Sequence, residues 1–124
     1  MTEATVKAGL VRAIKAEMGG CVVFRHEDVF TAGVPDISVT WHRRTLWVEV
    51  KLGRGRLSGA QNLALMRLGR QSMAVCVNYR EDGVANIQSF TSWLETDDVH
   101  SVPPGLDGHV AVARRLRAII LCCL

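Results

Sequence analysis

Residues 33–51, GVPDISVTWHRRTLWVEVK, constrain the fold of this chain more than any other stretch. Apolar residues alternate with other residues over 37–41 and 45–51, which predicts two half-buried strands joined by a turn at 42–44. Three ionisable residues, Asp36, Glu49 and Lys51, interrupt this apolar hairpin. Because burying an unpaired carboxylate is costly, these residues require a specific partner.

The register of the second strand predicts where these three side chains lie. Side chains in a strand alternate between the two faces of the sheet. We therefore expect Val48 and Val50 to face the core, and Glu49 and Lys51 to share the opposite face. Asp36 stands at the entrance of the first strand, which lies beside the exit of the second in a closed hairpin. Asp36, Glu49 and Lys51 are thus expected to converge.

A divalent cation is the partner that this convergence predicts. Two neighbouring carboxylates repel, so the pKa of at least one rises unless a cation lies between them. Magnesium prefers carboxylate oxygens, water and phosphate, and it can polarise a phosphoryl oxygen and lower the pKa of a bound water. Lys51 would then orient the attacking water or stabilise the phosphate charge. The backbone carbonyl of Val50 is available as a further ligand, so we expect a site for phosphodiester hydrolysis.

Elements on either side of the hairpin follow from periodicity and caps. Apolar residues at three-to-four spacing predict a helix over 3–18 that begins after Thr2 and ends at two glycines. A buried strand is expected over 21–26. Ser58 is expected to cap a helix over 58–70. Its apolar face would comprise Ala60, Leu63, Ala64 and Leu68.

The remaining sequence predicts a buried strand over 73–79, a shorter one within 84–90, a linker over 101–108 and a last helix over about 109–121. The resulting order, helix, three strands, helix and strand, predicts an α/β protein with a central mixed sheet flanked by helices. A length of 124 residues favours a single domain over 1–124, with a core at about 3–80 and a C-terminal extension. With no secretory signal, no membrane-length apolar run and no paired cysteine knuckles, we expect a cytoplasmic protein.

Three short motifs, GVPD, WVEVK and LSGAQ, occur in this order along the predicted elements. Together they resemble the PD-(D/E)XK nuclease superfamily and, within it, the virus-type replication-repair nuclease (VRR-NUC) domain family. The residues that carry the resemblance are Gly33, Pro35, Asp36, Glu49, Lys51, Leu57, Ser58 and Gln61. The predicted order of elements also resembles the restriction-endonuclease-like core of that superfamily, αβββαβ, over residues 3 to about 80.

The resemblance implies roles for particular residues. Asp36 and Glu49 would bind Mg²⁺ or Mn²⁺, Lys51 would serve the water or the phosphate, and Gln61 would border the site from the second helix. In this family a glutamate of the first helix often reaches the metal. Glu3 is the better positional match for that glutamate, and Glu17 is the alternative.

Basic residues near the motifs are candidates for binding the DNA backbone. The formal net charge of +3 mildly favours anionic binding partners. Arg43 and Arg44 stand in the hairpin turn, and Arg54 and Arg56 stand in a glycine-rich loop. Ser58, which follows this loop, is a further candidate contact to DNA. Phosphate contacts of this kind add salt-sensitive affinity, although a solvated basic face is the alternative. His26 precedes the GVPD loop, and for it a satisfied structural histidine is favoured over an acid–base role.

The function that we expect is a metal-dependent DNA endonuclease that is selective for branched DNA such as Holliday junctions. The sequence shows no separate target-recognition domain, whereas shape and phosphates can be read by a compact basic homodimer. A flap or nicking nuclease is the close alternative, and a restriction-type enzyme is less favoured. Alternatives from other classes are a nucleic-acid-binding module without turnover, a small-molecule phosphodiesterase, and a surface hairpin whose charged pair stabilises little. A stand-alone domain of this type suits a phage or prophage, and hence a bacterial or phage-infected host cell.

Overall fold

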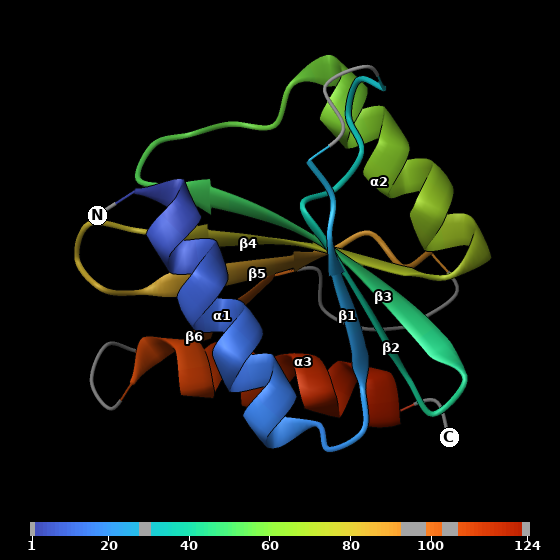
Figure 1. Ribbon diagram of the computed structural model, residues 1–124. Coiled ribbons are helices and arrows are strands. Elements are labelled where there is room, and N and C mark those ends of the chain that lie inside the picture. Colours follow the sequence, from blue (N-terminus) through green and yellow to red (C-terminus); the bar gives the residue numbers. More distant parts are fainter. Residues whose placement is uncertain (1, 28–30, 93–98, 103–106, 123–124) are drawn as a thin grey trace.

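The computed structural model describes residues 2–27, 31–92, 99–102 and 107–122 (Figure 1). The elements in chain order are α1 (Glu3–Glu17), β1 (Val22–Arg25), β2 (Ile37–Trp41), β3 (Arg44–Leu52), α2 (Gly59–Gln71), β4 (Met73–Tyr79), β5 (Ala85–Ser89), β6 (Val99–Val102) and α3 (Gly108–Leu121). In the part of the chain that the structure describes, no helix is both long and apolar enough to span a bilayer.

The strands form one sheet in the order β1-β2-β3-β4-β5-β6. β3 and β4 run parallel, and every other neighbouring pair is antiparallel. Parallel strands need a long crossover, which α2 supplies between β3 and β4. The predicted fold class is therefore confirmed: a mixed sheet is flanked by helices, and its first elements follow the order αβββαβ.

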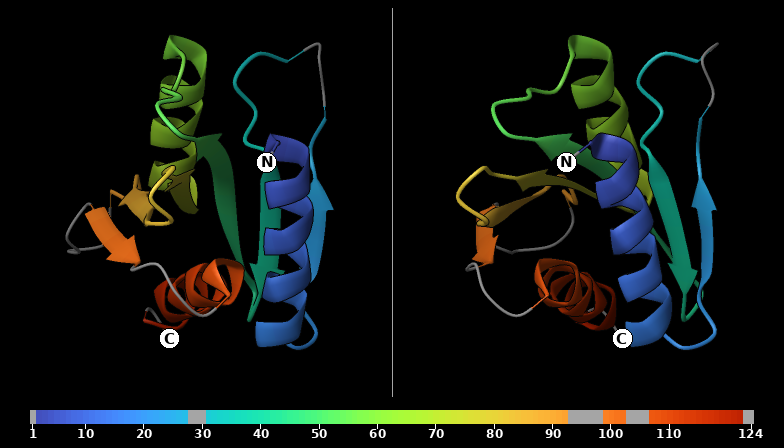
Figure 2. Two further views of the ribbon diagram at one scale, coloured as in Figure 1. Left: turned by 90° about the vertical axis from the view of Figure 1, so that its left-hand side faces the viewer. Right: turned by 60° about the vertical axis from the view of Figure 1, so that its left-hand side comes forward.

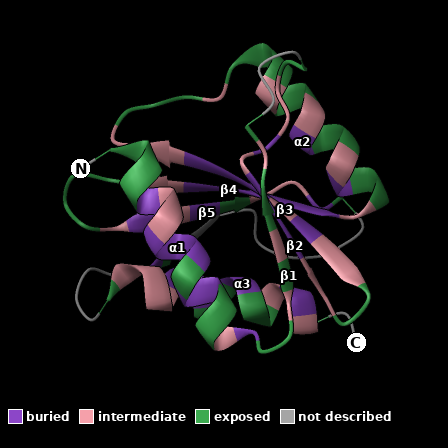
Figure 3. Ribbon diagram, in the orientation of Figure 1, coloured by how far each residue is buried: buried purple, intermediate pink, exposed green. Residues whose placement is uncertain are grey.

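Helices cover the two faces of the sheet unequally. α1 and α3 pack against each other and bury Leu10, Ile14, Leu116 and Ile120 completely against one face. On the other face, Leu65 of α2 packs in a smaller cluster. α2 stands apart from α1 and α3 (Figure 2) and is mostly exposed or half-buried (Figure 3). One face of the sheet is thus a continuous core, whereas the other is only partly covered.

The hairpin has the predicted register. Trp41 pairs with Arg44 and Ile37 pairs with Val48, so the turn contains only His42 and Arg43. Both residues have positive φ, 51° and 64°, as the two-residue turn that fits the twist of a hairpin requires. The predicted turn at 42–44 is therefore one residue too long, because Arg44 already belongs to β3.

Two predictions about burial are wrong. β1 was expected to be buried, yet Val22 is 49% and Phe24 is 60% exposed. β1 is an edge strand, so it pairs only with β2, and α2 does not reach across to cover it. In α2, the buried residues are Leu65 and Gly69, whereas Leu63 is 48% exposed. Gly69 lies so close to the Phe90 carbonyl that a Cβ would overlap it, and this backbone contact sets the rotation of the helix.

The C-terminal part of the chain is more integrated than the prediction of an extension implied. β5 and β6 continue the sheet, and α3 buries Val112, Leu116 and Ile120 in the same cluster as α1. Within the predicted linker, residues 101–102 belong to β6, and 103–106 lie outside the described residues. Local sequence patterns miss this because a four-residue edge strand has no distinct periodicity.

Candidate active site

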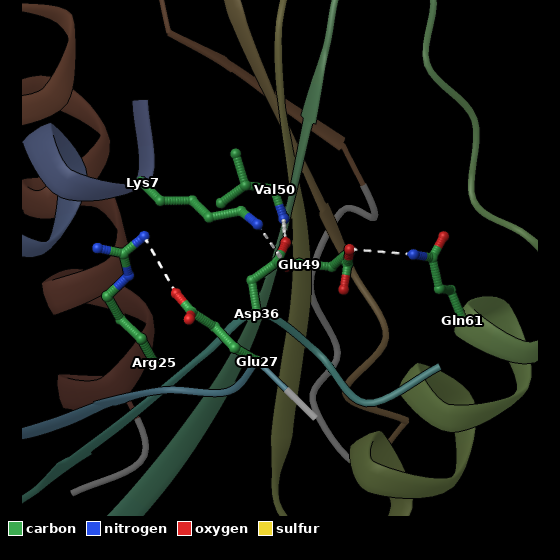
Figure 4. Close-up of polar contacts among 7 residues, drawn as sticks. All are labelled: Lys7, Arg25, Glu27, Asp36, Glu49, Val50 and Gln61. Carbon is green, nitrogen blue, oxygen red and sulfur yellow. Dashed lines mark hydrogen bonds and ion pairs between the residues drawn. The ribbon is translucent and has the colours of Figure 1, made fainter. Parts of the chain in front are cut away.

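Asp36 is held at the entrance of β2 by contacts from three directions. The backbone N–H of His26 donates to its carbonyl at 2.8 Å. The Val50 N–H donates to Asp36 Oδ2 at 2.9 Å, and Lys7 Nζ lies 2.8 Å from Oδ1 (Figure 4). Both carboxylate oxygens of Asp36 therefore have partners, one from β3 and one from α1.

Ile37 pairs with Val48, so the same register places Glu49 opposite Asp36. The Glu49 residue is only 3% exposed. Its Oε1 accepts a hydrogen bond from Gln61 Nε2 at 3.3 Å. Its Oε2 is buried and has no hydrogen-bond partner within the described part of the chain. Burial and, to a lesser extent, the charge of Asp36 and the hydrogen bond that protonated Glu49 can make to Asp36 raise the pKa of Glu49 to about 8, although Lys51 and Lys7 oppose this shift. Burial is thus the main cause of the raised pKa of Glu49, and repulsion from the Asp36 carboxylate adds to it.

The donor set at this point fits an open site for a hard cation. Among the described residues, no group of three or more His, Cys, Asp and Glu side chains could hold a metal ion. Asp36 and Glu49 supply carboxylates, and the Val50 carbonyl points to the same side of β3 as its N–H, which faces Asp36. Magnesium is commonly bound through one or two carboxylates, with water and phosphate completing its shell. A divalent cation would also satisfy the orphaned Oε2 of Glu49.

Gln61 connects α2 to this pair of carboxylates. Ser58 Oγ accepts from the Gln61 N–H at 3.1 Å, and Gln61 Oε1 accepts from the Ser58 N–H at 2.9 Å, which completes a capping box. Because Oε1 faces Ser58, the amide nitrogen of Gln61 is left to face Glu49. The helix cap therefore fixes the orientation of the amide toward the carboxylate. Ser58, predicted to contact DNA, uses its hydroxyl as this cap.

Gly33 brings the loop before Asp36 against the same end of α2. Its φ of +85° belongs to the left-handed region, and a Cβ at this position would overlap the Ala60 carbonyl. The glycine of the GVPD motif thus allows two backbones to approach closely. Asp36 and Gln61 come into one site through this contact.

Two of the four arginines predicted to bind DNA, Arg54 and Arg56, line hollows beside the end of β3. Arg56 lines a cavity together with Lys51, and Arg54 lines a neighbouring hollow with Glu81. Arg43 and Arg44, in contrast, occupy the far end of the hairpin. Glu49 lies five positions after Arg44 along the extended strand, a span of roughly 17 Å. The structure therefore does not bring Arg43 and Arg44 to the carboxylates.

Helix α1 contributes a lysine where a glutamate was expected. Glu17, the alternative to Glu3 as a metal ligand, lies at the far end of α1 from Lys7 and pairs with Arg114 at 3.3 Å. Glu3 is exposed and lies one helical turn before Lys7, which reaches Asp36. Prediction from the sequence missed Lys7. The sequence feature that could have indicated Lys7 is its position next to Val6 and one turn before Leu10, both of which are buried. This places Lys7 at the edge of the helix face that packs on the sheet.

His26 lies on the sheet next to these groups and has structural partners. Its Nε2 is 2.8 Å from Ser38 Oγ, and its ring centroid is 5.1 Å from that of Trp47. The expected preference for a structural histidine agrees with this packing.

Comparisons with known proteins give little further information. No protein-family model matches the chain, and no curated protein sequence matches it. A solved structure that it resembles is that of Hjc, a Holliday junction resolvase from the archaeal hyperthermophile Archaeoglobus fulgidus. The two are 19% identical, with a TM-score of 0.49, over 81% of this chain and 86% of that chain. A likeness at this level assigns no function.

Proposed function

We propose that this protein is a metal-dependent DNA endonuclease of the PD-(D/E)XK superfamily, of the virus-type replication-repair branch. The observation that carries the proposal is the pairing of Asp36 with Glu49. Two carboxylates meet where β2 begins and β3 nears its end, and one of them keeps a buried oxygen without a partner in the described chain. Lys51 follows two residues along the same face of β3. Two carboxylates for a divalent cation and a lysine on the same face support hydrolysis of a phosphodiester as the reaction.

Each side chain has a role in this proposal. Asp36, Glu49 and the Val50 carbonyl would hold Mg²⁺ or Mn²⁺, which when bound supplies Lewis acidity toward a phosphoryl oxygen. Gln61 keeps Glu49 in place by its hydrogen bond from the capped end of α2. Lys51 would orient the attacking water or stabilise the charge that develops on the phosphate. Arg54 and Arg56 would contact the backbone of the substrate strand.

The proposed substrate is branched DNA, such as a four-way junction, and the proposed assembly is a homodimer. A compact basic protein can read DNA shape and phosphates without an extended surface for reading bases. Paired cuts on a two-fold symmetric junction require two sites related by the same symmetry. Light scattering on the purified protein, alone and with junction DNA, measures the mass and hence tests the dimer.

The test of the activity is cleavage of labelled DNA by the purified protein with Mg²⁺ or Mn²⁺. The substrates are a four-way junction, a flap, a splayed arm, a linear duplex and a single strand. We expect paired cuts on the junction that vanish in Asp36→Asn and Lys51→Met, while Arg43→Gln, far from the site, retains cleavage. Cuts confined to flaps would keep the chemistry and change the substrate. DNA binding with no cleavage by the wild-type protein under either metal would overturn the proposal in favour of a non-catalytic binding module.

A further inference from the structure

Beside the candidate active site, polar side chains form a grid on the face of the sheet that carries α2. Glu49 pairs in register with Cys76, and Cys76 pairs with Gln88. One step along the strands, Lys51 pairs with Asn78, and Asn78 pairs with Asn86. Because residues two apart in a strand share a face, these two rows lie next to each other on the face that α2 only partly covers.

A cavity of about 570 Å³ lies over this grid. Its floor is formed by Lys51, Cys76, Asn78, Asn86 and Gln88, and Arg56 approaches it from the loop between β3 and α2. The volume lies within the range of small-molecule binding sites, and Lys51 is common to the cavity and the candidate active site. A ligand in the cavity would therefore lie directly beside a phosphate held at Asp36 and Glu49.

The carboxamides of the floor offer both hydrogen-bond donors and acceptors. Asn78 Nδ2 donates to the Gly55 carbonyl at 3.3 Å, which fixes the orientation of the amide because a carbonyl can only accept. Its Oδ1 is then buried without a hydrogen-bond partner in the part of the chain that the structure describes. Asn86 Oδ1 accepts from Ser101 Oγ at 3.1 Å, so the oxygen of this amide is engaged and its NH₂ group is the part that a ligand in the cavity would contact. Burial raises the pKa of the Cys76 thiol to about 11, so it contributes a neutral surface.

We propose that this cavity binds one unstacked nucleotide of the DNA substrate, next to the phosphate that is cut. Carboxamides pair with the edges of bases, whereas Lys51 and Arg56 suit the flanking phosphate. A base edge is free for such contacts when the nucleotide is unpaired, as in a splayed arm, or when a base pair next to a junction opens. This inference rests on the proposed nuclease function and deepens it, since it names an unpaired nucleotide as the feature by which branched DNA is selected.

The test measures binding without cleavage, by fluorescence anisotropy of a splayed-arm DNA in EDTA. The double variant Asn86→Ala/Gln88→Ala should bind roughly tenfold more weakly than the wild type, the loss expected for one base contact. The matched control is Asn62→Ala/Gln71→Ala, which removes two exposed carboxamides from α2. Asn86→Asp, which keeps the shape of the side chain, should also weaken binding, and thermal melting shows that each variant is folded.

A second arm replaces single nucleotides of the splayed arm by abasic sites, which keep the phosphate and remove the base. At one position next to the branch, removal of the base should weaken wild-type binding by a similar factor and leave the double variant unchanged. Equal wild-type affinity for intact and abasic DNA at every position, or unaltered binding by folded pocket variants, would overturn the inference. Pocket-dependent binding without any metal-dependent cleavage would instead refute the nuclease and leave the nucleotide pocket standing.

Discussion

At the scale of single residues, the pKa of Glu49 links the site to stability. In the absence of metal, its pKa of about 8 lies above the ordinary value of 4.5, so between these pH values the folded state binds more protons than the unfolded state. The resulting stabilisation is complete below about pH 4.5 and is lost as the pH rises through 8. Glu49 therefore makes the metal-free protein less stable in mildly alkaline solution.

Urea unfolding in EDTA from pH 5 to pH 9 measures this effect. The free energy of unfolding should fall by up to about 1.4 kcal/mol per pH unit through this range. Glu49→Gln, which mimics the protonated side chain, should flatten the curve and be the more stable form at pH 8. Glu3→Gln, at an exposed position, should retain the wild-type slope. Parallel curves for the wild type and Glu49→Gln would contradict this assignment.

Lys7 is the second residue with a testable consequence, because its ammonium occupies one oxygen of Asp36. A divalent cation must compete with this ion pair for the same carboxylate. Lys7→Gln is therefore expected to increase the affinity for Mn²⁺ by roughly tenfold, since one lost interaction of about 1.4 kcal/mol has that effect. Titration calorimetry on the DNA-free protein measures the affinity. Lys15→Gln, exposed on the same helix, is the control, and an unchanged or weaker affinity in Lys7→Gln would refute the competition.

At the scale of elements, the contact of Gly33 with the start of α2 places Gln61 at Glu49. Gly33→Ala should lower the free energy of unfolding by about 3 kcal/mol, because a positive φ is strained for alanine and the new Cβ meets the Ala60 carbonyl. Gly20→Ala separates the two causes. Gly20 has a similar φ of +80°, but a Cβ there would meet nothing within 4 Å, so only about 1 kcal/mol is expected.

Thermal melting and cleavage of both glycine variants check this prediction. Gly33→Ala should also impair cleavage, because α2 must shift away from Glu49 to relieve the overlap. Gly20→Ala should cleave as the wild type does. Similar losses of stability in the two variants would mean that overlap with the Ala60 carbonyl adds nothing to the cost of Gly33→Ala.

At the scale of the whole molecule, α3 is part of the core although it lies far along the chain from the catalytic motifs. Leu116 is fully buried between α1 and the sheet, so Leu116→Ala should destabilise the protein by about 3 kcal/mol. Leu63→Ala, on the exposed side of α2, should cost less than about 1 kcal/mol. Urea unfolding followed by tryptophan fluorescence measures both losses. A small loss in Leu116→Ala would mean that the core around α1 folds independently of α3.

Local chemistry explains what could be predicted from the sequence. Alternation along 45–51 places Glu49 and Val50 on opposite sides of β3 whatever surrounds the strand, since side-chain direction is a property of the extended backbone. Thr2 and Ser58 cap their helices through bonds that span only three residues. The approach of Asp36 to Glu49 follows from a short turn, which also fixes the register.

Contacts between residues far apart in the sequence explain the features that could not be predicted. Lys7 reaches Asp36 because α1 crosses the sheet near the end of β3, and no pattern within the helix encodes that crossing (Figure 1). The rotation of α2 about its axis depends on the contact of Gly69 with Phe90. β1 is exposed because α2 does not extend over it. Asn78 and Asn86 become neighbours only when β4 and β5 pair. Patterns within a segment predict its own geometry, whereas the site also depends on which segments meet.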